Sequence, residues 1–198
     1  MNQVENSMLS IGRLTNLFIL IAGSLLFASC EEEADLSRNF VVSAGEHYAS
    51  PRIVQTLQSN TLTFTAKFNE TAIYHFDDAS FQDSKNKLLG FSDCNSLHHE
   101  NSARFAWQWY NNRLEIYAYC YVNGAREEKF IGTVNLHQEN RYQLKVSGDS
   151  YSFQLNNQEA VYIKRGNDCD KGIYYMLWPY FGGTIPAPHD VHIALTIE

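Results

Sequence analysis

Alternation of apolar and polar residues marks several stretches of the chain as strands with one buried face. Residues 61–68 read TLTFTAKF, with leucine, phenylalanine and alanine on one side and threonine and lysine on the other. Residues 191–197 alternate in the same way. Because a period of two is typical of half-buried strands, both stretches are predicted to bury one face in a core.

The pattern of residues 101–124 predicts a β-hairpin with a specific register. Asn111 and Asn112 form its turn, because asparagine tolerates the positive φ values of two-residue turns. When Tyr110 is paired with Arg113, one face is wholly apolar, with Ala103, Phe105, Trp107 and Trp109 opposite Cys120, Ala118, Ile116 and Leu114. The other face carries Ser102, Arg104, Ala106 and Gln108 opposite Tyr121, Tyr119, Tyr117 and Glu115. A slip of one residue would place both tryptophans with the charged groups, so the pattern specifies the register.

Short alternating stretches continue through the rest of the chain, and no long stretch keeps a helical period. Further strands are predicted at residues 72–76, 88–92, 129–134, 142–146, 151–155, 160–164 and 173–180. Continuing the hairpin register would place Glu127 opposite Cys120 on the apolar face, so a bulge is expected near Glu127 or Glu128. Many short strands without a substantial helix predict an all-β fold, a single two-sheet antiparallel β-sandwich of the jelly-roll type.

Residues 1–29 have the pattern of an export signal rather than of a folded element. Arg13 precedes the apolar run of residues 17–27, which is too short for a permanent membrane span. Ala28 and Ser29 then precede Cys30, and this arrangement resembles the lipobox of bacterial lipoproteins. The resemblance implies that Cys30 is lipidated and attaches the protein to a membrane. An ordinary signal peptide with an incidental cysteine is the alternative.

The acidic triplet at residues 31–33 resembles the surface-export signal of Bacteroidetes lipoproteins. We therefore expect an exported lipoprotein of the outer membrane, and the triplet favours its outward face. The alternative is that the glutamates simply begin a solvated linker. Residues 30–50 are predicted to be the lipidated tether, and residues 51–198 the β-sandwich domain.

Composition and charge narrow the class of partner. The 198 residues include 12 tyrosines and 12 phenylalanines, which suits a β-rich globular domain. The formal net charge is -7, and no run of lysine or arginine is present. Because phosphate contacts need clustered basic residues, a nucleic-acid partner is not expected.

Three cysteines follow Cys30. Cys120 lies on the apolar face of the hairpin, so we expect it to be a buried thiol. Cys94 and Cys169 lie in loop-like sequences and could form a disulfide in an exported protein, but the sequence leaves their pairing open.

Two clusters contain residue types that bind metals, His98-His99-Glu100 and His189-Asp190-His192. Adjacent residues of a strand point to opposite sides, so the first cluster is not expected to hold a metal ion. Asp190 could bind calcium near the last strand, although capping of a turn is favoured. No cofactor is expected.

Four groups of residues, spread over most of the chain after the leader, carry a family resemblance: residues 87–88 with 90–94, residues 101–105, residues 114–116 with 118–119, and residues 179–183 with 187–190. They resemble an uncharacterised family of Bacteroidetes lipoproteins, and this resemblance implies no particular activity. More remotely, the strand pattern and the segment YYMLWPYFGG look similar to the concanavalin-like jelly roll of lectins, glucanases and alginate lyases. That likeness implies a fold rather than a function. The glutamate signature of the glucanases and the alginate-lyase motifs are not reproduced.

The polar face of the hairpin is the candidate site. Tyrosine rings stack on sugars and their hydroxyl groups hydrogen-bond, so we expect this face to bind a glycan through Arg104, Gln108, Glu115, Tyr117, Tyr119 and Tyr121. Two structural alternatives are that the tyrosines reflect strand propensity alone, or that a loop covers the face and Arg104 pairs with Glu115.

We favour glycan binding over catalysis. The enzyme alternative is a polysaccharide lyase that cleaves a uronic-acid polymer by β-elimination. Arg104 would neutralise the substrate carboxylate, Tyr119 would move the proton, and Gln108, His98 or His99 would assist. The acidic net charge argues against a polyanionic substrate. A glycoside hydrolase would need a second carboxylate beside Glu115, and a structural lipoprotein without a ligand is also left open.

Overall fold

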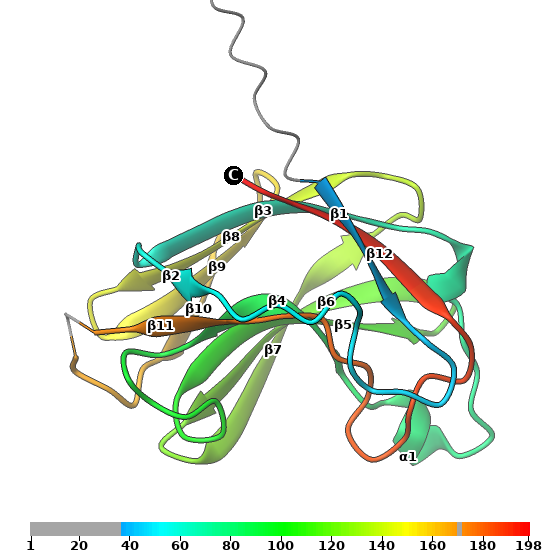
Figure 1. Cartoon of the computed structure of the whole chain (residues 1–198), viewed down its shortest axis with the longest axis horizontal. Coiled ribbons are helices and arrows are strands. Elements are labelled where there is room, and N and C mark those ends of the chain that lie inside the picture. The colour runs from blue at the N-terminus through cyan, green and yellow to red at the C-terminus, as the bar shows by residue number, and fades with distance from the viewer. Residues whose placement is uncertain (1–36, 170–171) are drawn as a thin grey trace, which may run out of the picture. The chain divides into compact units, whose positions relative to one another are not determined.

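Strands with one apolar face become stable when two sheets pack those faces together. The computed structural model describes residues 37–169 and 172–198, and its strands form two six-stranded antiparallel sheets that lie one over the other (Figure 1). The predicted all-β sandwich is therefore confirmed. The predictions for the leader, including lipidation of Cys30, lie outside the described residues.

The order of strands in each sheet follows from their pairing. Sheet A consists, in spatial order, of β1 (Ser37–Val42), β12 (Val191–Ile197), β3 (Thr61–Phe68), β8 (Asn140–Ser147), β9 (Ser150–Leu155) and β10 (Val161–Lys164). Sheet B consists of β2 (Thr56–Leu57), β11 (Tyr174–Leu177), β4 (Asn86–Ser92), β5 (Ser102–Tyr110), β6 (Arg113–Val122) and β7 (Ala125–Val134).

Aromatic rings fill the space between the sheets. The ring of Phe64 in sheet A stacks on Tyr142 at 5.0 Å and meets Phe105 of sheet B edge-on at 5.8 Å. Phe105 also meets Phe153 edge-on at 5.2 Å. Each such buried ring stabilises the fold by about 1.5–3 kcal/mol, so these contacts hold the two sheets together.

The central hairpin has the predicted register. Cα partners run from Tyr110 and Arg113 at the turn to Ser102 and Tyr121 at the far end, without a break. Asn111 and Asn112 have φ values of 51° and 57°, as a two-residue turn requires. The apolar face points into the core, where Trp107 is fully buried. The opposite face is therefore the outer face of sheet B.

The sandwich begins earlier in the chain than expected. Ser37–Val42 lies within the predicted tether, but it forms β1 and pairs with β12 at the other end of the chain. Phe40 and Val42 are buried in the core. This strand is short and lies in a polar context, so it depends on a long-range pairing that local periodicity cannot reveal.

The bulge in β7 lies elsewhere than predicted. Glu127 pairs directly with Cys120, and the register shifts instead beside Ile116 and Tyr117. β7 is the edge of sheet B, and there Glu127 stays exposed. Because an edge strand lets a core-side charge reach water, no bulge is needed at this glutamate.

A strand predicted at residues 72–76 is absent. The chain instead forms a 3-10 helix at Glu70–Ala72, whose first turn is capped by the side chain of Asn69. A second short helix, α1 (Ala79–Gln82), is capped by Asp78. Within the described residues, no helix has the length and apolar character needed to cross a membrane.

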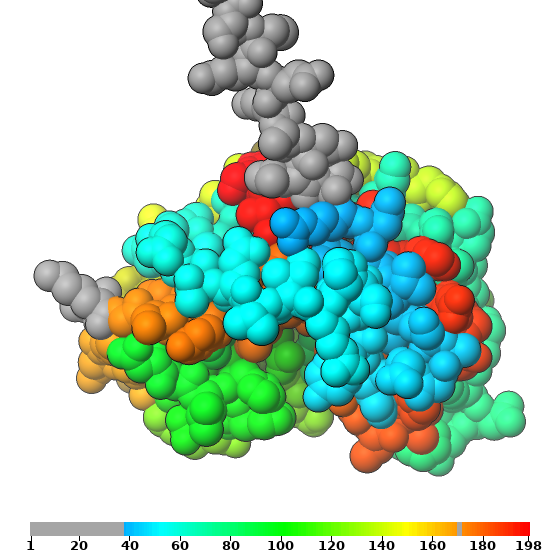
Figure 2. All heavy atoms as spheres, in the orientation of Figure 1, coloured from blue at the N-terminus to red at the C-terminus, as the bar shows by residue number. Residues whose placement is uncertain are grey.

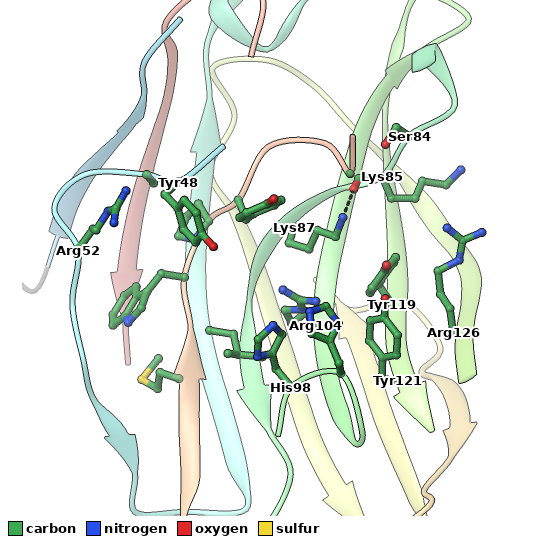
Figure 3. Close-up of a pocket in the computed structure, with 18 of the residues that line it drawn as sticks. Tyr48, Arg52, Ser84, Lys85, Lys87, His98, Arg104, Tyr119, Tyr121 and Arg126 are labelled. Atoms are coloured by element: carbon green, nitrogen blue, oxygen red, sulfur yellow. Dashed lines mark hydrogen bonds between the residues drawn. The ribbon is translucent and has the colours of Figure 1, made fainter. Parts of the chain in front are cut away.

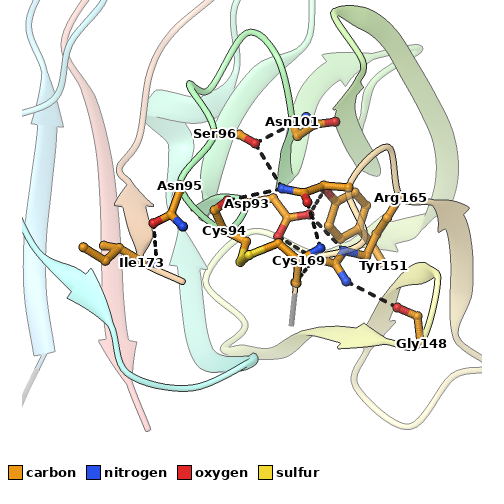
Figure 4. Close-up of a disulfide and its surroundings, with 11 residues drawn as sticks. Asp93, Cys94, Asn95, Ser96, Asn101, Gly148, Tyr151, Arg165, Cys169 and Ile173 are labelled. Carbon is orange, nitrogen blue, oxygen red and sulfur yellow. Dashed lines mark hydrogen bonds and ion pairs between the residues drawn. A yellow bond between two sulfur atoms is a disulfide. The ribbon is translucent and has the colours of Figure 1, made fainter. Parts of the chain in front are cut away.

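A disulfide joins the two sheets near one end of the sandwich. Cys94, which follows β4, is bonded to Cys169, which follows β10 (Figure 4). Beside it the guanidinium of Arg165 donates to both carboxylate oxygens of Asp93 at 2.9 Å, and Tyr151 donates to the same carboxylate at 2.6 Å. The pairing that the sequence left open is thus present, and Cys120 is a buried free thiol as predicted.

Candidate functional site

The outer face of sheet B is covered at one end and hollow at the other. At the covered end, Gln108 and Glu115 are buried, and the ammonium of Lys85 lies 4.6 Å from the ring centre of Tyr117. At the other end a groove of about 570 Å³ lies over Arg104, Tyr119 and Tyr121. The segment around residues 48–53 borders the groove on the face seen in Figure 2.

The side chains that line the groove are mainly cationic and aromatic. The cations are Arg52, Lys85, Lys87, Arg104 and Arg126, and the aromatic residues are Tyr48, Tyr119, Tyr121, Trp178 and Tyr180. His98 and His99 complete the rim from the loop between β4 and β5. In Figure 3, Arg104 and Lys87 lie between Tyr48 and Arg52 on one side and Arg126 on the other.

The predicted ligand residues divide into two groups. Arg104, Tyr119 and Tyr121 line the groove, as do both histidines of the lyase hypothesis. The remaining three, Gln108, Glu115 and Tyr117, lie at the covered end and do not line it.

The residues at the covered end hydrogen-bond to one another. The Gln108 amide and the Tyr117 hydroxyl donate to the same Glu115 oxygen at 2.9 and 2.6 Å. Arg113 donates to the other oxygen at 2.8 Å, so the expected alternative of an Arg104–Glu115 pair is not what the structure shows. Burial acts to raise the pKa of Glu115, but these hydrogen bonds outweigh it and the pKa is lowered. This carboxylate is therefore a structural anchor.

Arg104 forms the floor of the groove. It is only 7% exposed, and its guanidinium carbon lies 5.5 Å from the ring centre of Tyr119. Its Nε atom is buried without a hydrogen-bond partner. Burial lowers the pKa of the guanidinium, but arginine stays charged at neutral pH. Arg104 is therefore a buried cation of the groove floor with an unsatisfied donor.

Lys87 is the second buried cation of the floor, and the sequence interpretation missed it. Its ammonium donates to the backbone oxygens of Gly182 and Lys85 at 2.7 and 2.9 Å and lies 5.0 Å from the ring centre of Tyr119. Burial, with the charges of Arg104 and Arg126, lowers its pKa to about 8. The lysine is the second residue of β4, where the register shifts between Lys87 and Leu89 and turns it to the outer face. A bulge of this kind breaks the alternation on which sequence reasoning depends.

Tyrosine and histidine rings line the groove beside the two cations of the floor. The rings of Tyr119 and Tyr121 are 6.0 Å apart, and His99 meets Tyr121 edge-on at 5.2 Å. Burial and the neighbouring Tyr121 raise the pKa of Tyr119 to about 12, so its phenol is protonated at neutral pH. Burial, His99 and Arg104 lower the pKa of His98, which keeps this imidazole neutral.

The second histidine cluster lies away from the groove and serves the fold. Asp190 accepts a hydrogen bond from the backbone of Ala44 at 2.8 Å, and His189 contacts the backbone oxygen of Thr71 at 2.9 Å. Among residues 37–169 and 172–198, no three His, Cys, Asp or Glu side chains gather where they could hold a metal ion.

Comparison with known proteins places the fold. No protein-family model matches the chain, and no curated protein matches its sequence. Among solved structures, the alginate lyase AlyC3 in complex with dimannuronate has a TM-score of 0.55 at 10% identity, covering 82% of this chain and 73% of that one.

Two further structures give similar values. The alginate lyase from Klebsiella pneumoniae has a TM-score of 0.53 at 9% identity over 70% of this chain, which spans only 58% of that lyase. A family 16 endo-glucanase from Bacteroides ovatus has a TM-score of 0.51 at 8% identity, covering 81% and 79% of the two chains. At these identities the likeness shows the fold alone, a jelly-roll β-sandwich like that of these two alginate lyases and this glucanase.

Proposed function

We propose that this protein binds an extracellular polysaccharide in the groove on the outer face of sheet B. The groove itself carries the proposal, because its volume of about 570 Å³ is lined by tyrosine and tryptophan rings. Such rings stack on sugar faces while their hydroxyl groups form hydrogen bonds. The jelly-roll neighbours support the proposal at the level of the fold, since one of them is a complex with dimannuronate.

Affinity electrophoresis of the purified protein in gels that contain different polysaccharides tests the proposal. At least one polysaccharide should retard migration, and Tyr121→Ala should weaken the retardation because it removes a ring from the groove. Tyr162→Ala is the matched control, since Tyr162 is an exposed tyrosine on β10 of the other sheet. Unretarded migration in every gel would contradict the proposal.

We also propose that the protein is an exported lipoprotein, held at the outer membrane through Cys30, and akin to the Bacteroidetes lipoproteins that its sequence resembles. The leader pattern and the acidic triplet at residues 31–33 support this location. Cys30→Ser should move the protein from the membrane fraction to the soluble fraction. Retention of this variant in the membrane fraction would contradict lipid attachment.

A lyase acting on a uronic-acid polymer is the second candidate, because a cation and proton-transfer groups meet in the groove. Arg104 would hold the substrate carboxylate, the neutral imidazole of His98 could accept the proton from carbon, and the protonated phenol of Tyr119 could donate to the leaving oxygen. Gln108 is excluded from this set, since it is fully buried among other partners.

Ultraviolet absorbance of unsaturated products from alginate and other uronans distinguishes a lyase from a binding protein. A lyase should produce rising absorbance that Tyr119→Phe abolishes, whereas a binding protein leaves every trace flat. A glycoside hydrolase is not proposed, because no Asp or Glu of the described residues lines the groove and that reaction needs two carboxylates.

A further inference from the structure

We propose that Arg104 and Lys87 form an anion subsite in the floor of the groove, and that the polysaccharide bound there is acidic. The inference rests on the proposed glycan binding and names the class of glycan. It is based on which of the buried cationic side chains have a carboxylate partner and which do not.

Four cationic side chains are buried in the described part of the chain, and they fall into two pairs. Arg165 is paired with Asp93 at 2.9 Å, and Lys85 is paired with Asp83 at 2.8 Å and with Glu128 at 3.6 Å. Arg104 and Lys87 are 7% and 8% exposed. Neither makes an ion pair with a carboxylate among residues 37–169 and 172–198.

Two buried cations without carboxylate partners oppose folding, because each loses its hydration and the two repel each other. The repulsion is visible in Lys87, whose pKa is lowered by burial first and by Arg104 next, with Glu128 acting in the opposite direction. The other two buried cations, Arg165 and Lys85, each have a carboxylate partner within the protein. At this position the missing partner is most simply an anionic group of the ligand.

The geometry brings both cations to one point. Arg104 and Lys87 lie on the adjacent strands β5 and β4, and both approach the ring of Tyr119, at 5.5 and 5.0 Å. The Nε donor of Arg104 is unused. A carboxylate or sulfate group above Tyr119 could thus accept charge-assisted hydrogen bonds from two directions.

Further cations extend the charge along the groove. Arg52 lies on one wall beside Tyr48, with its guanidinium 4.7 Å from that ring, and Arg126 lies on the opposite side (Figure 3). No carboxylate of the described residues lines the groove between them. Cations on both sides of a central pair fit a chain that carries negative charge on successive sugars rather than on one.

The charge of the groove is local. The whole chain has a net charge of -7, which repels a polyanion from most of the surface. Binding of an acidic polysaccharide would therefore report on the groove itself. A uronate and a sulfated glycan share the required chemistry, so the experiment must separate these two sources.

Binding of the purified protein is measured by calorimetry against alginate, carboxyl-reduced alginate, dextran sulfate and unmodified dextran. The reduced polymer is the matched control, because it keeps the sugar chain and loses only the charge. Alginate or dextran sulfate should bind, the two neutral polymers should bind at least about tenfold more weakly, and added salt should weaken binding. Preference between the two acidic polymers identifies the anionic group.

Variants locate the subsite. Arg104→Gln should lower affinity by about tenfold to a hundredfold, since hydrogen bonds to charged groups are among the strongest. Lys67→Gln, on β3 of the other sheet, makes the same change in net charge at an exposed site and should have no effect. Arg126→Gln is a second variant whose exposed side chain can be replaced without disturbing the core, and it should weaken binding by a few fold.

A thermal melt of unliganded Arg104→Gln separates a binding role from a structural one. Removal of an unpaired buried charge should leave the melting temperature unchanged or raised, whereas a structural arginine would lower it. Equal binding of alginate and its reduced form, without salt dependence, would overturn the acidic subsite and leave glycan binding intact. Absence of binding to all four polymers and to a wider glycan panel would overturn both.

Discussion

At the scale of single residues, the buried charged side chains of this protein are of two kinds, those with an oppositely charged partner and those without one. Asp93 and Arg165 are buried together, and Tyr151 completes the hydrogen bonding of the carboxylate. Arg104 and Lys87 are buried with no such partner. The first arrangement stabilises the fold, because every charge is neutralised. The second leaves two buried cations without a neutralising carboxylate, an arrangement typical of functional sites.

Lys87 makes stability depend on pH in a specific direction. Its pKa is lowered to about 8 from 10.5, so between these values the folded state holds fewer protons than the unfolded state. Stability then rises with pH in that window, and the full penalty is present below pH 8. Lys87→Met removes the group, so its stability advantage over the wild type should shrink by about 1 kcal/mol between pH 7 and pH 9.

Urea unfolding at the two pH values measures this difference. Lys67→Met is the control, because Lys67 is exposed and its removal should give the same difference from the wild type at both pH values. An advantage of Lys87→Met that grows with pH would show that the sign is wrong.

At the scale of elements, the site depends on how closely β4 approaches β5. Gly90 pairs with Arg104, and a Cβ atom at Gly90 would meet the Ala103 backbone oxygen and lie 2.5 Å from the Arg104 Cα atom. Both are backbone atoms, which cannot relieve the contact by a change of rotamer. The absence of a side chain at Gly90 therefore leaves the space that Arg104 occupies beside it in the floor of the groove.

Gly90→Ala should force the two strands apart. Overpacking of a close contact usually costs about 1–3 kcal/mol, and the displaced Arg104 should bind ligand more weakly. Thermal unfolding and calorimetry measure the two effects. Gly183→Ala is the control at the rim of the same groove, because its nearest contact would be an ordinary 3.5 Å to Ser84. If both alanine variants behave as the wild type, the close approach does not position Arg104.

At the scale of the whole molecule, sequence-distant segments meet to form both the sandwich and the groove. β1 pairs with β12 across nearly the whole described chain, and the groove takes side chains from residues 48–53, 84–126 and 176–183. The disulfide between Cys94 and Cys169 spans 75 residues and connects the end of β4 to the segment that leads into β11. It thus stabilises the wall of the groove that β11 and the following residues provide.

Loss of this cross-link should weaken the whole fold. The double substitution Cys94→Ala with Cys169→Ala should lower the free energy of unfolding by about 2–5 kcal/mol, since the unfolded chain regains the entropy of a long loop. Chemical denaturation under non-reducing conditions measures the loss. Cys120→Ala, which removes only a buried thiol, should cost less. Equal stability of the double variant and the wild type would mean that the bond does not constrain the unfolded chain.

The register of the central hairpin could be predicted from the sequence because it is a local property. A period of two and an asparagine turn place Trp107 on one face and Arg104, Tyr119 and Tyr121 on the other. The division into two antiparallel sheets follows from the same periodicity. The leader pattern supports export in the same local way, and that prediction is still to be tested.

Long-range packing sets which part of the outer face is open. Gln108, Glu115 and Tyr117 have the same alternation as Arg104 and Tyr119, but they hydrogen-bond to one another and Lys85 lies over the ring of Tyr117. Coverage depends on where distant segments pack, and no local pattern encodes it. The bulge that turns Lys87 outward and the pairing of β1 with β12 have the same origin. Local alternation therefore determined the faces of the strands, while long-range packing determined which of those faces became a site.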